Sequence, residues 1–193
     1  MPVANPEAFA FLAARRSHPA KAFVVGGATP DRGALAPILA AALRVPDHGK
    51  LEPWRLIVLT RPDMVRLADM AEARARALGG DAEKIDKGRG QFDRGGVAVV
   101  VISSPQDVPK IPQAEQVLSA GALCLGLVNA ATAAGWGANW LTGWVSHDTI
   151  FAAEAFGCKA GETVAGIVHI GTPGSPAPER PRPDLARVVR WGL

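Results

Sequence analysis

The stretch from residue 113 to 134 constrains this fold more than any other, because it is long, has helical spacing and consists largely of small apolar residues. Its few polar side chains include Ser119, Asn129 and Thr132. A helix that is apolar all round must be covered all round. Its Ala and Gly content makes it weakly hydrophobic for a membrane span, so we expect a buried helix and no membrane contact. In a chain this short, a second copy can bury the apolar surface that the chain itself leaves exposed on this helix. We therefore predict a two-fold homodimer.

Continuous runs of branched residues predict buried strands on either side of this helix. The run VAVVVIS, residues 97–103, is the clearest, and TVAGIVHIG, residues 163–171, is the last strand. Shorter runs predict strands over 55–60 and within 135–143. The predicted further helices cover residues 5–16, 31 to about 45, 62–78, a short piece of 82–92, and 147–156. Because helices and strands alternate, the class is mixed α and β.

At 193 residues the chain is long enough for one domain with a sizeable core. We expect a single domain over residues 1–173 and an extended C-terminal arm over residues 174–193. The arm is rich in Pro and Arg and has too little apolar surface to fold by itself. Yet Val188, Val189, Trp191 and Leu193 lie near its end, so we expect the tip to dock on this subunit or on a partner.

Composition narrows the classes of partner and compartment. The net charge is +3, but Lys and Arg are scattered and never form the dense stripe typical of nucleic-acid binding. The 2 cysteines, Cys124 and Cys158, have no CxxC spacing, so neither a disulfide framework nor a metal site is indicated. The N-terminal apolar run has no basic leader and reads as an amphipathic helix. A reducing cytoplasm fits best.

Common catalytic fingerprints are missing from the sequence. It contains no GxxxxGK[ST], no GxGxxG after a first strand, no GxSxG and no HExxH. These absences argue against a kinase, a Rossmann dehydrogenase, a serine hydrolase and a zinc protease.

Three polar clusters are candidates for a binding site, and each has a purely structural alternative. Arg15-Arg16-Ser17 either caps the end of the first helix or clamps a phosphate with guanidinium groups and a hydroxyl. The loop RVPDHGKLEPWR, residues 44–55, is either a surface turn or a proline-stiffened ligand loop. GWGANWLTG, residues 135–143, is either a glycine-kinked strand or a place where backbone approaches a flat ligand.

The order of these clusters resembles that of the nitroreductase-like FMN flavoproteins, most closely the small bacterial NAD(P)H nitroreductase subgroup. The series runs RRS, RxPDHxxxxPW, a strand, EQxxSAG opening the small-residue helix, GxGxxWxTG and GTP, and it spans residues 9–173. The resemblance implies an α+β nitroreductase-like fold with a central, mostly antiparallel sheet flanked by helices. It also implies an intertwined homodimer that binds FMN at the subunit interface.

The same resemblance assigns roles by matching motifs. Arg15, Arg16 and Ser17 would bind the phosphate and ribityl end of FMN, Arg44 and His48 would come from the opposing subunit, and Trp140, Leu141 and Thr142 would lie beside the flavin. NAD(P)H would be a co-substrate that reduces the flavin at N5, followed by ping-pong transfer to a nitroaromatic, quinone or related acceptor. No side chain would act as acid, base or nucleophile, and no metal is implied.

The fold also hosts dehalogenation, enoate reduction and flavin fragmentation, and a non-enzymatic flavin-binding protein is a further alternative. The chain departs from the family pattern at Pro19, Glu52 and Ala114. Pro19 replaces a lysine that stabilises reduced flavin in the wider family, which leaves Lys21 or Arg44 to supply that charge.

Overall fold

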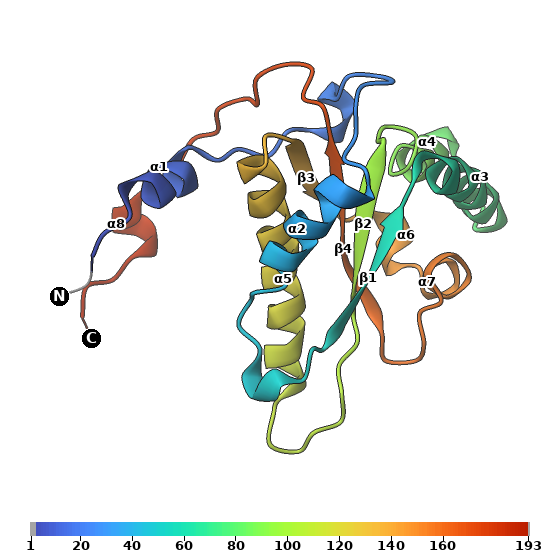
Figure 1. Ribbon diagram of the computed structural model, residues 1–193. Coiled ribbons are helices and arrows are strands. Elements are labelled where there is room, and N and C mark those ends of the chain that lie inside the picture. The colour runs from blue at the N-terminus through green and yellow to red at the C-terminus, as the bar shows by residue number, and fades with distance from the viewer. Residues whose placement is uncertain (1–2, 193) are drawn as a thin grey trace.

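Strand β2, Val97–Ser103, lies inside a four-stranded sheet of order β1-β2-β4-β3 in which each neighbouring pair is antiparallel (Figure 1). The computed structural model describes residues 3–192. The other strands are β1 Trp54–Leu59, β3 Gly137–Leu141 and β4 Thr163–Gly171. The antiparallel sheet expected from the resemblance is therefore confirmed.

Helices cover both faces of the sheet (Figure 1). Helices α2, Arg32–Ala42, and α5, Gln113–Ala133, pack on one face. Helices α3, Arg61–Ala77, α6, Trp144–His147, and α7, Thr149–Phe156, pack on the other. Helix α4, Ala82–Arg89, packs beside α3. Short 3-10 turns η1, Ala20–Ala22, and η2, His48–Lys50, lie in the loops.

Residues of β2 alternate between the two hydrophobic clusters, as the pleat of a strand requires. Val99 and Val101 face α2 and α5, whereas Val100 and Ile102 face α3 and α7, and all four are fully buried. Burial of each such side chain contributes roughly 1.5–3 kcal/mol, so this strand connects the two halves of the core.

Helix α5 is only partly covered within one chain. Leu123, Leu127 and Ala131 are buried against the sheet, whereas Leu118 and Leu125 are 72% and 47% exposed. Among the described residues, α5 is long and apolar enough to cross a membrane by length and composition, but 44% of that window is buried in the protein. The expectation of complete cover is thus not met by one copy of the chain.

Helix α1, Pro6–Ala14, and the short helix α8, Leu185–Val188, stand away from the body in one arm (Figure 1). Neither contains a buried residue, and Phe9 and Trp191 are 75% and 89% exposed. Isolated helices this short are marginal in water, so their apolar side chains need a covering surface.

Several predicted boundaries differ from the structure. Helix α1 ends at Ala14, with Arg15 as its C-cap, rather than at Arg16. The helix predicted over 147–156 begins at Thr149, because the Asp148 carboxylate accepts the Phe151 N–H at 2.7 Å and starts α7. The short helix α6 before it was not predicted. Helix α8 within the C-terminal arm was not predicted.

Candidate functional site

The segment Arg15–Ser17 lies between α1 and η1, next to a residue that is hydrogen-bonded to strand β3. The amide of His18 donates to the Ala138 carbonyl at 2.9 Å, which holds this segment against the edge strand. Arg15 Nη1 lies 3.5 Å from Ser17 Oγ, and the Ser17 side chain is exposed. A guanidinium and a hydroxyl are therefore presented together beside β3.

Arg16 has two structural roles in this chain. Its Nη1 donates to the carbonyls of Ala13 and Ala14 at 3.0 and 2.7 Å, which caps the end of α1. Its Nε and Nη2 donate to one oxygen of Glu179 from the C-terminal arm, at 2.8 and 2.5 Å, and Arg182 Nη2 is 3.6 Å from the other oxygen. Hydrogen bonding to Arg16 lowers the pKa of the Glu179 carboxyl. The fork of Arg16 is thus already arranged around an anion.

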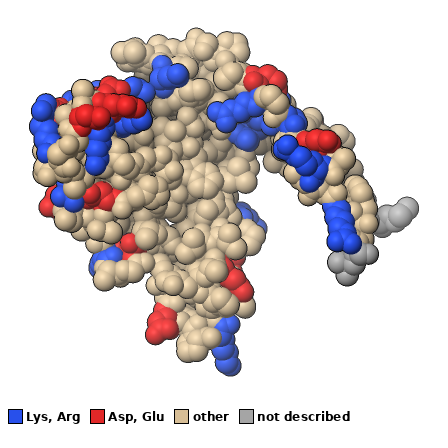
Figure 2. Space-filling view, turned by 180° about the vertical axis from the view of Figure 1, so that it is seen from behind, with Lys and Arg blue, Asp and Glu red and all other residues tan. Residues whose placement is uncertain are grey.

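Cationic side chains are numerous on the arm. Figure 2 shows Lys and Arg gathered on the arm and at its root, while the middle of the same face carries few charged residues. Opposed guanidinium groups around one carboxylate are the arrangement that also binds phosphate.

A hollow of about 440 Å³, here called the β3 pocket, begins two residues after this segment, at Pro19, and none of Arg15, Arg16 and Ser17 lines it. Pockets that bind small molecules and cofactors have volumes of ~300–1,000 Å³. Its lining comes from η1, α4, the end of β3 and the loop after it: Pro19, Ala20, Lys21, Asp86, Lys87, Gly90, Gln91, Arg94, Asn139, Leu141, Thr142, Gly143 and Trp144.

The three predicted residues 140–142 do not all point to the same side of the sheet. Leu141 and Thr142 line the β3 pocket, together with Asn139. Trp140 points to the opposite face, where its Nε1 donates to the Ala165 carbonyl at 3.2 Å. Gly166 leaves room for the indole, since a Cβ there would overlap it. Only the backbone of Trp140 is therefore close to the pocket side of β3.

The pocket lining is predominantly cationic. Lys21, Lys87 and Arg94 carry positive charge and Asp86 carries negative charge. Arg94 Nη2 lies 3.7 Å from Asp86 Oδ2, a long ion pair. A hydrogen bond to Glu83 raises the pKa of Lys87 and keeps its ammonium group protonated. Such a lining favours an anionic or electron-rich ligand.

Two glycines shape the pocket by allowing close packing. A Cβ at Gly88 would lie 2.6 Å from Cζ2 of Trp144, so only glycine lets α4 approach this ring. A Cβ at Gly143 would lie 2.9 Å from Cδ of Gln91. Within the described chain, Gln91 Oε1 and His18 Nδ1 are buried without a hydrogen-bond partner, although buried polar groups are normally paired. A ligand in this pocket offers such a partner to Gln91.

His169 lies on β4 directly across from Asn139 of β3 and is fully buried. Burial lowers its pKa to about 4, so the ring is neutral at pH 7. Its two ring nitrogens make no hydrogen bond within residues 3–192. His169 thus lies in the wall behind the site rather than in its lining.

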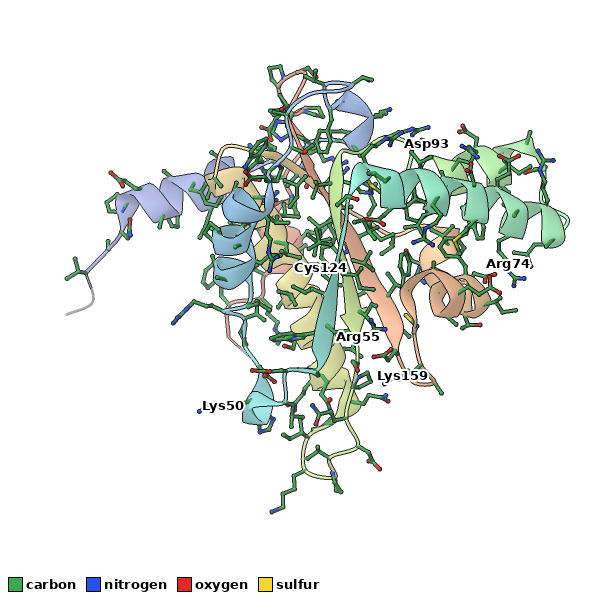
Figure 3. All side chains as sticks on the ribbon, turned by 45° about the vertical axis from the view of Figure 1, so that its right-hand side comes forward. Lys50, Arg55, Arg74, Asp93, Cys124 and Lys159 are labelled. Carbon is green, nitrogen blue, oxygen red and sulfur yellow. The ribbon has the colours of Figure 1, made fainter. Side chains whose placement is uncertain are left out.

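Arg44 and His48 are not brought to the β3 pocket in this chain. The Nδ1 of His48 is 2.7 Å from Oε2 of Glu115 at the start of α5, and both side chains are about half exposed. Arg44 is exposed at the end of α2. Figure 3 shows Lys50 of the same loop at the end of the molecule opposite to Asp93, which is next to the pocket residue Arg94.

The loop that carries His48 is held rigidly. The Asp47 carboxylate accepts the N–H groups of Leu51 and Glu52 at 3.2 and 2.8 Å. Ser119 Oγ donates to the Pro46 carbonyl at 2.8 Å, and Trp54 Nε1 donates to the same hydroxyl at 3.1 Å. Lys50 and Glu52 have φ values of 55° and 48°, and such left-handed backbone in non-glycine residues is often a functional feature.

The structure therefore divides the predicted residues into two groups. Arg15, Ser17, Leu141 and Thr142 share one edge of the sheet, while Arg44 and His48 lie elsewhere. Sequence reasoning missed the pocket residues of α4 and the loop after it: Asp86, Lys87, Gly90, Gln91 and Arg94. No local pattern marks them, because only tertiary packing brings α4 to β3. No cluster of three or more metal-binding side chains occurs within residues 3–192.

This chain is similar in sequence to proteins of a known family. The model of the "Nitroreductase family" matches residues 13–172. The chain belongs to the nitroreductase family. The Escherichia coli (strain K12) protein named "Putative NAD(P)H nitroreductase YdjA" is 33% identical over 144 residues, which is 75% of this chain and 78% of that protein. The resemblance carried by the motifs is thus confirmed, and the protein is an oxidoreductase.

Solved structures confirm the nitroreductase-like α+β fold. A "Nitroreductase-like Family Protein" from Bacillus cereus has a TM-score of 0.73 at 20% identity, covering 99% of this chain and 98% of that chain. A Desulfovibrio desulfuricans "putative nitroreductase in complex with fmn" also has a TM-score of 0.73, at 19% identity and 99% coverage of both chains. At these identities the likeness concerns the fold alone.

Proposed function

We propose that this protein is an FMN-dependent oxidoreductase that uses NAD(P)H to reduce a nitroaromatic, quinone or related small-molecule acceptor. The main observation is at the edge strand β3: the segment after Ser17 is hydrogen-bonded to Ala138 through His18, and a cationic pocket of about 440 Å³ opens from Pro19 to Leu141 and Thr142. Family membership and a fold shared with an FMN complex support the same cofactor.

The residues present fit the two chemically different ends of FMN. Arg15, Arg16 and Ser17 would hold the phosphate, with Arg182 of the arm close by and the Glu179 carboxylate displaced by the stronger anion. The β3 pocket would hold the ring system, with Thr142 and the backbone near Trp140 and Leu141 at its edge. Gln91 Oε1, buried without a partner, would accept a hydrogen bond from a ring N–H.

When bound, FMN would supply the redox chemistry, by exchanging hydride at N5 with NAD(P)H and then with the acceptor in a ping-pong cycle. The protein orients the reactants and neutralises charge. Lys21, Lys87 and Arg94 stabilise negative charge in the pocket, and Lys21 supplies the cation that the sequence lacks at Pro19. No acid, base or nucleophile among the pocket side chains is required.

The proposed enzyme is an intertwined homodimer in which Arg44 and His48 complete the flavin site of the other subunit. Three apolar surfaces support this: the outer face of α5 and both helices of the arm, with Leu118, Phe9 and Leu185 largely exposed. An exposed apolar area of this kind marks a protein interface. Arg44 and His48 belong to the loop of residues 44–55, which the hydrogen bonds of Asp47 and Ser119 hold in place.

The test is to purify the protein, record its visible spectrum, and add NADH or NADPH without oxygen. We expect a flavin spectrum that bleaches with at least one nicotinamide cofactor and returns on addition of a quinone. A protein that takes up no FMN contradicts the proposal. A flavin spectrum that neither cofactor bleaches favours a flavin-binding protein without reductase activity.

The phosphate clamp is tested separately with Arg15→Ala. Loss of a charge-assisted hydrogen bond of roughly 1.5–3 kcal/mol should weaken FMN binding about tenfold or more, measured by the return of flavin fluorescence on dilution. The matched control is Arg66→Ala, an exposed arginine of α3. Equal FMN retention in both variants would mean that Arg15 only ends the helix.

A further inference from the structure

A second hollow adjoins the β3 pocket and has a volume of about 310 Å³. We call it the Gly-rich pocket; it is lined by residues 23–29, 93–96, Arg61, Gly171 and Thr172. It contains five glycines, Gly26, Gly27, Gly95, Gly96 and Gly171, so much of its wall is bare backbone. Figure 3 labels Asp93, which marks its position beside the start of α3.

Arg94 connects the two hollows, because it lines both of them. Its side chain is 46% exposed, and its ion pair with Asp86 is long, at 3.7 Å. The guanidinium is therefore free to turn towards a ligand that extends from one pocket to the other.

Arg61 supplies a second guanidinium, held in place by the pocket wall. Its Nη1 donates to the carbonyls of Phe92, Asp93 and Gly95 at 3.2, 2.9 and 3.2 Å. Within residues 3–192 all three of these bonds come from Nη1, so Nε and Nη2 of Arg61 remain for an anion. The Asp93 carboxylate also lines the pocket, but Arg89 Nε lies 3.2 Å from it and offsets its charge.

The glycines keep this space open and the loops close together. Gly26 has a φ of 69°, which favours glycine, and a Cβ at Gly96 would overlap the Thr29 methyl group. A Cβ at Gly27 would lie 2.9 Å from Val24 Cβ and 3.2 Å from Thr172 Cβ. The pocket therefore combines closely packed loops with two guanidinium groups, and guanidinium groups bind phosphate through charge-assisted hydrogen bonds.

We propose that the Gly-rich pocket binds the 2′-phosphate and ribose of NADPH, so that the enzyme prefers NADPH to NADH. The inference rests on the proposed function, since the nicotinamide ring must lie over the FMN ring system proposed for the β3 pocket. The volume is at the lower end of the range for ligand sites and suits a ribose phosphate better than a whole dinucleotide. Arg94 and Arg61 select the phosphate that NADH lacks.

The first test is the ratio of kcat/KM for NADPH to that for NADH, measured in one preparation so that any loss of FMN cancels. We expect a ratio of about ten or more for the wild type, and a fall of about tenfold in Arg94→Gln, because one charge-assisted contact is lost. A wild-type ratio near one, or an unchanged ratio in Arg94→Gln, overturns the proposal.

The second test places a carboxylate at the rim of the pocket. Val25 is 100% exposed, so Val25→Glu should fold normally, and Val25→Gln is the control of equal size without charge. We expect Val25→Glu to raise the KM for NADPH about fivefold relative to Val25→Gln, and the effect to shrink at high salt. The KM for NADH should agree in the two variants; an equal rise for both cofactors contradicts a phosphate-specific site.

A third test does not depend on catalysis. Calorimetric titration of the purified protein with adenosine 2′,5′-bisphosphate should show binding at least about tenfold tighter than with 5′-AMP. If the protein lacks FMN, this titration still tests the pocket, so failure of the flavin proposal is distinguishable. Inorganic phosphate that inhibits NADPH oxidation as strongly as the bisphosphate would show a general anion site and overturn the assignment.

Discussion

Acid should destabilise this fold through one buried residue, His169 of β4. Burial lowers the pKa of its ring to about 4 from the ordinary value of 6.5. Between these values the unfolded chain binds a proton that the folded chain does not, so stability falls as the pH decreases. The stability contributed by the neutral ring is fully present above pH 6.5 and is progressively lost towards pH 4.

The two pKa values give the size of the effect. A difference of one pKa unit corresponds to about 1.36 kcal/mol, so the complete loss is about 3 kcal/mol. Between pH 7.5 and 4.5 the linkage relation gives a decrease of about 2.5 kcal/mol in the free energy of unfolding. Below pH 4.5 carboxylates contribute as well, since Arg55 holds the pKa of Glu162 at about 2 in the folded state.

The assay is urea unfolding at pH 7.5 and 4.5, at one protein concentration and with one FMN concentration. His169→Leu removes the titrating ring and its two unpaired nitrogens, so its unfolding free energy should change far less over this range. The control is His147→Gln, which removes an exposed histidine and should keep the wild-type pH dependence. Equal pH dependence in the wild type and His169→Leu would refute the argument.

Two further predictions concern packing and charge. Glu162→Gln removes the ion pair with Arg55 at 2.8 Å and should lower the free energy of unfolding by about 2 kcal/mol in chemical denaturation. The control Glu83→Gln removes an exposed ion pair with Lys87 and should change this free energy little. Gly88→Ala places a Cβ 2.6 Å from Trp144 and should destabilise the protein by about 1–3 kcal/mol and release FMN, whereas Gly33→Ala in α2 should do neither. Thermal unfolding and flavin fluorescence measure both effects.

The central strands could be predicted from the sequence because both of their faces are buried by neighbouring elements. β2 and β4 have the predicted bounds, since sheet residues buried on both faces leave a continuous run of branched side chains. Helix α8 could not be predicted, because four residues carry no periodicity. The start of α7 at Thr149 was detectable from Asp148, an N-capping residue directly before it.

The candidate site was only half visible in the sequence. The motifs predicted Arg15, Ser17 and the end of β3 as site residues, and the structure places them at one edge of the sheet. They grouped Trp140 with Leu141, but neighbours in a strand face opposite sides, and the indole packs against the other face. Lys87 and Gln91 reach the pocket because α4 packs closely on Trp144, a tertiary contact that leaves no local pattern.

The pairing of β2 with β4 also affects how the chain folds during synthesis. Val97 pairs with Ile170, so the central ladder can close only after α5 and β3 have been made. Until then β2 can pair with β1 only, and its other backbone edge stays open. Such unpaired strand edges are prone to aggregation. The hydrogen bonds of helix α5 are local, so it can begin to form without a distant partner. Pairing β2 with β4 must instead close the long segment between them, which costs chain entropy. We therefore expect nascent chains truncated before residue 163 to depend on chaperones, and full-length chains released from the ribosome to escape them.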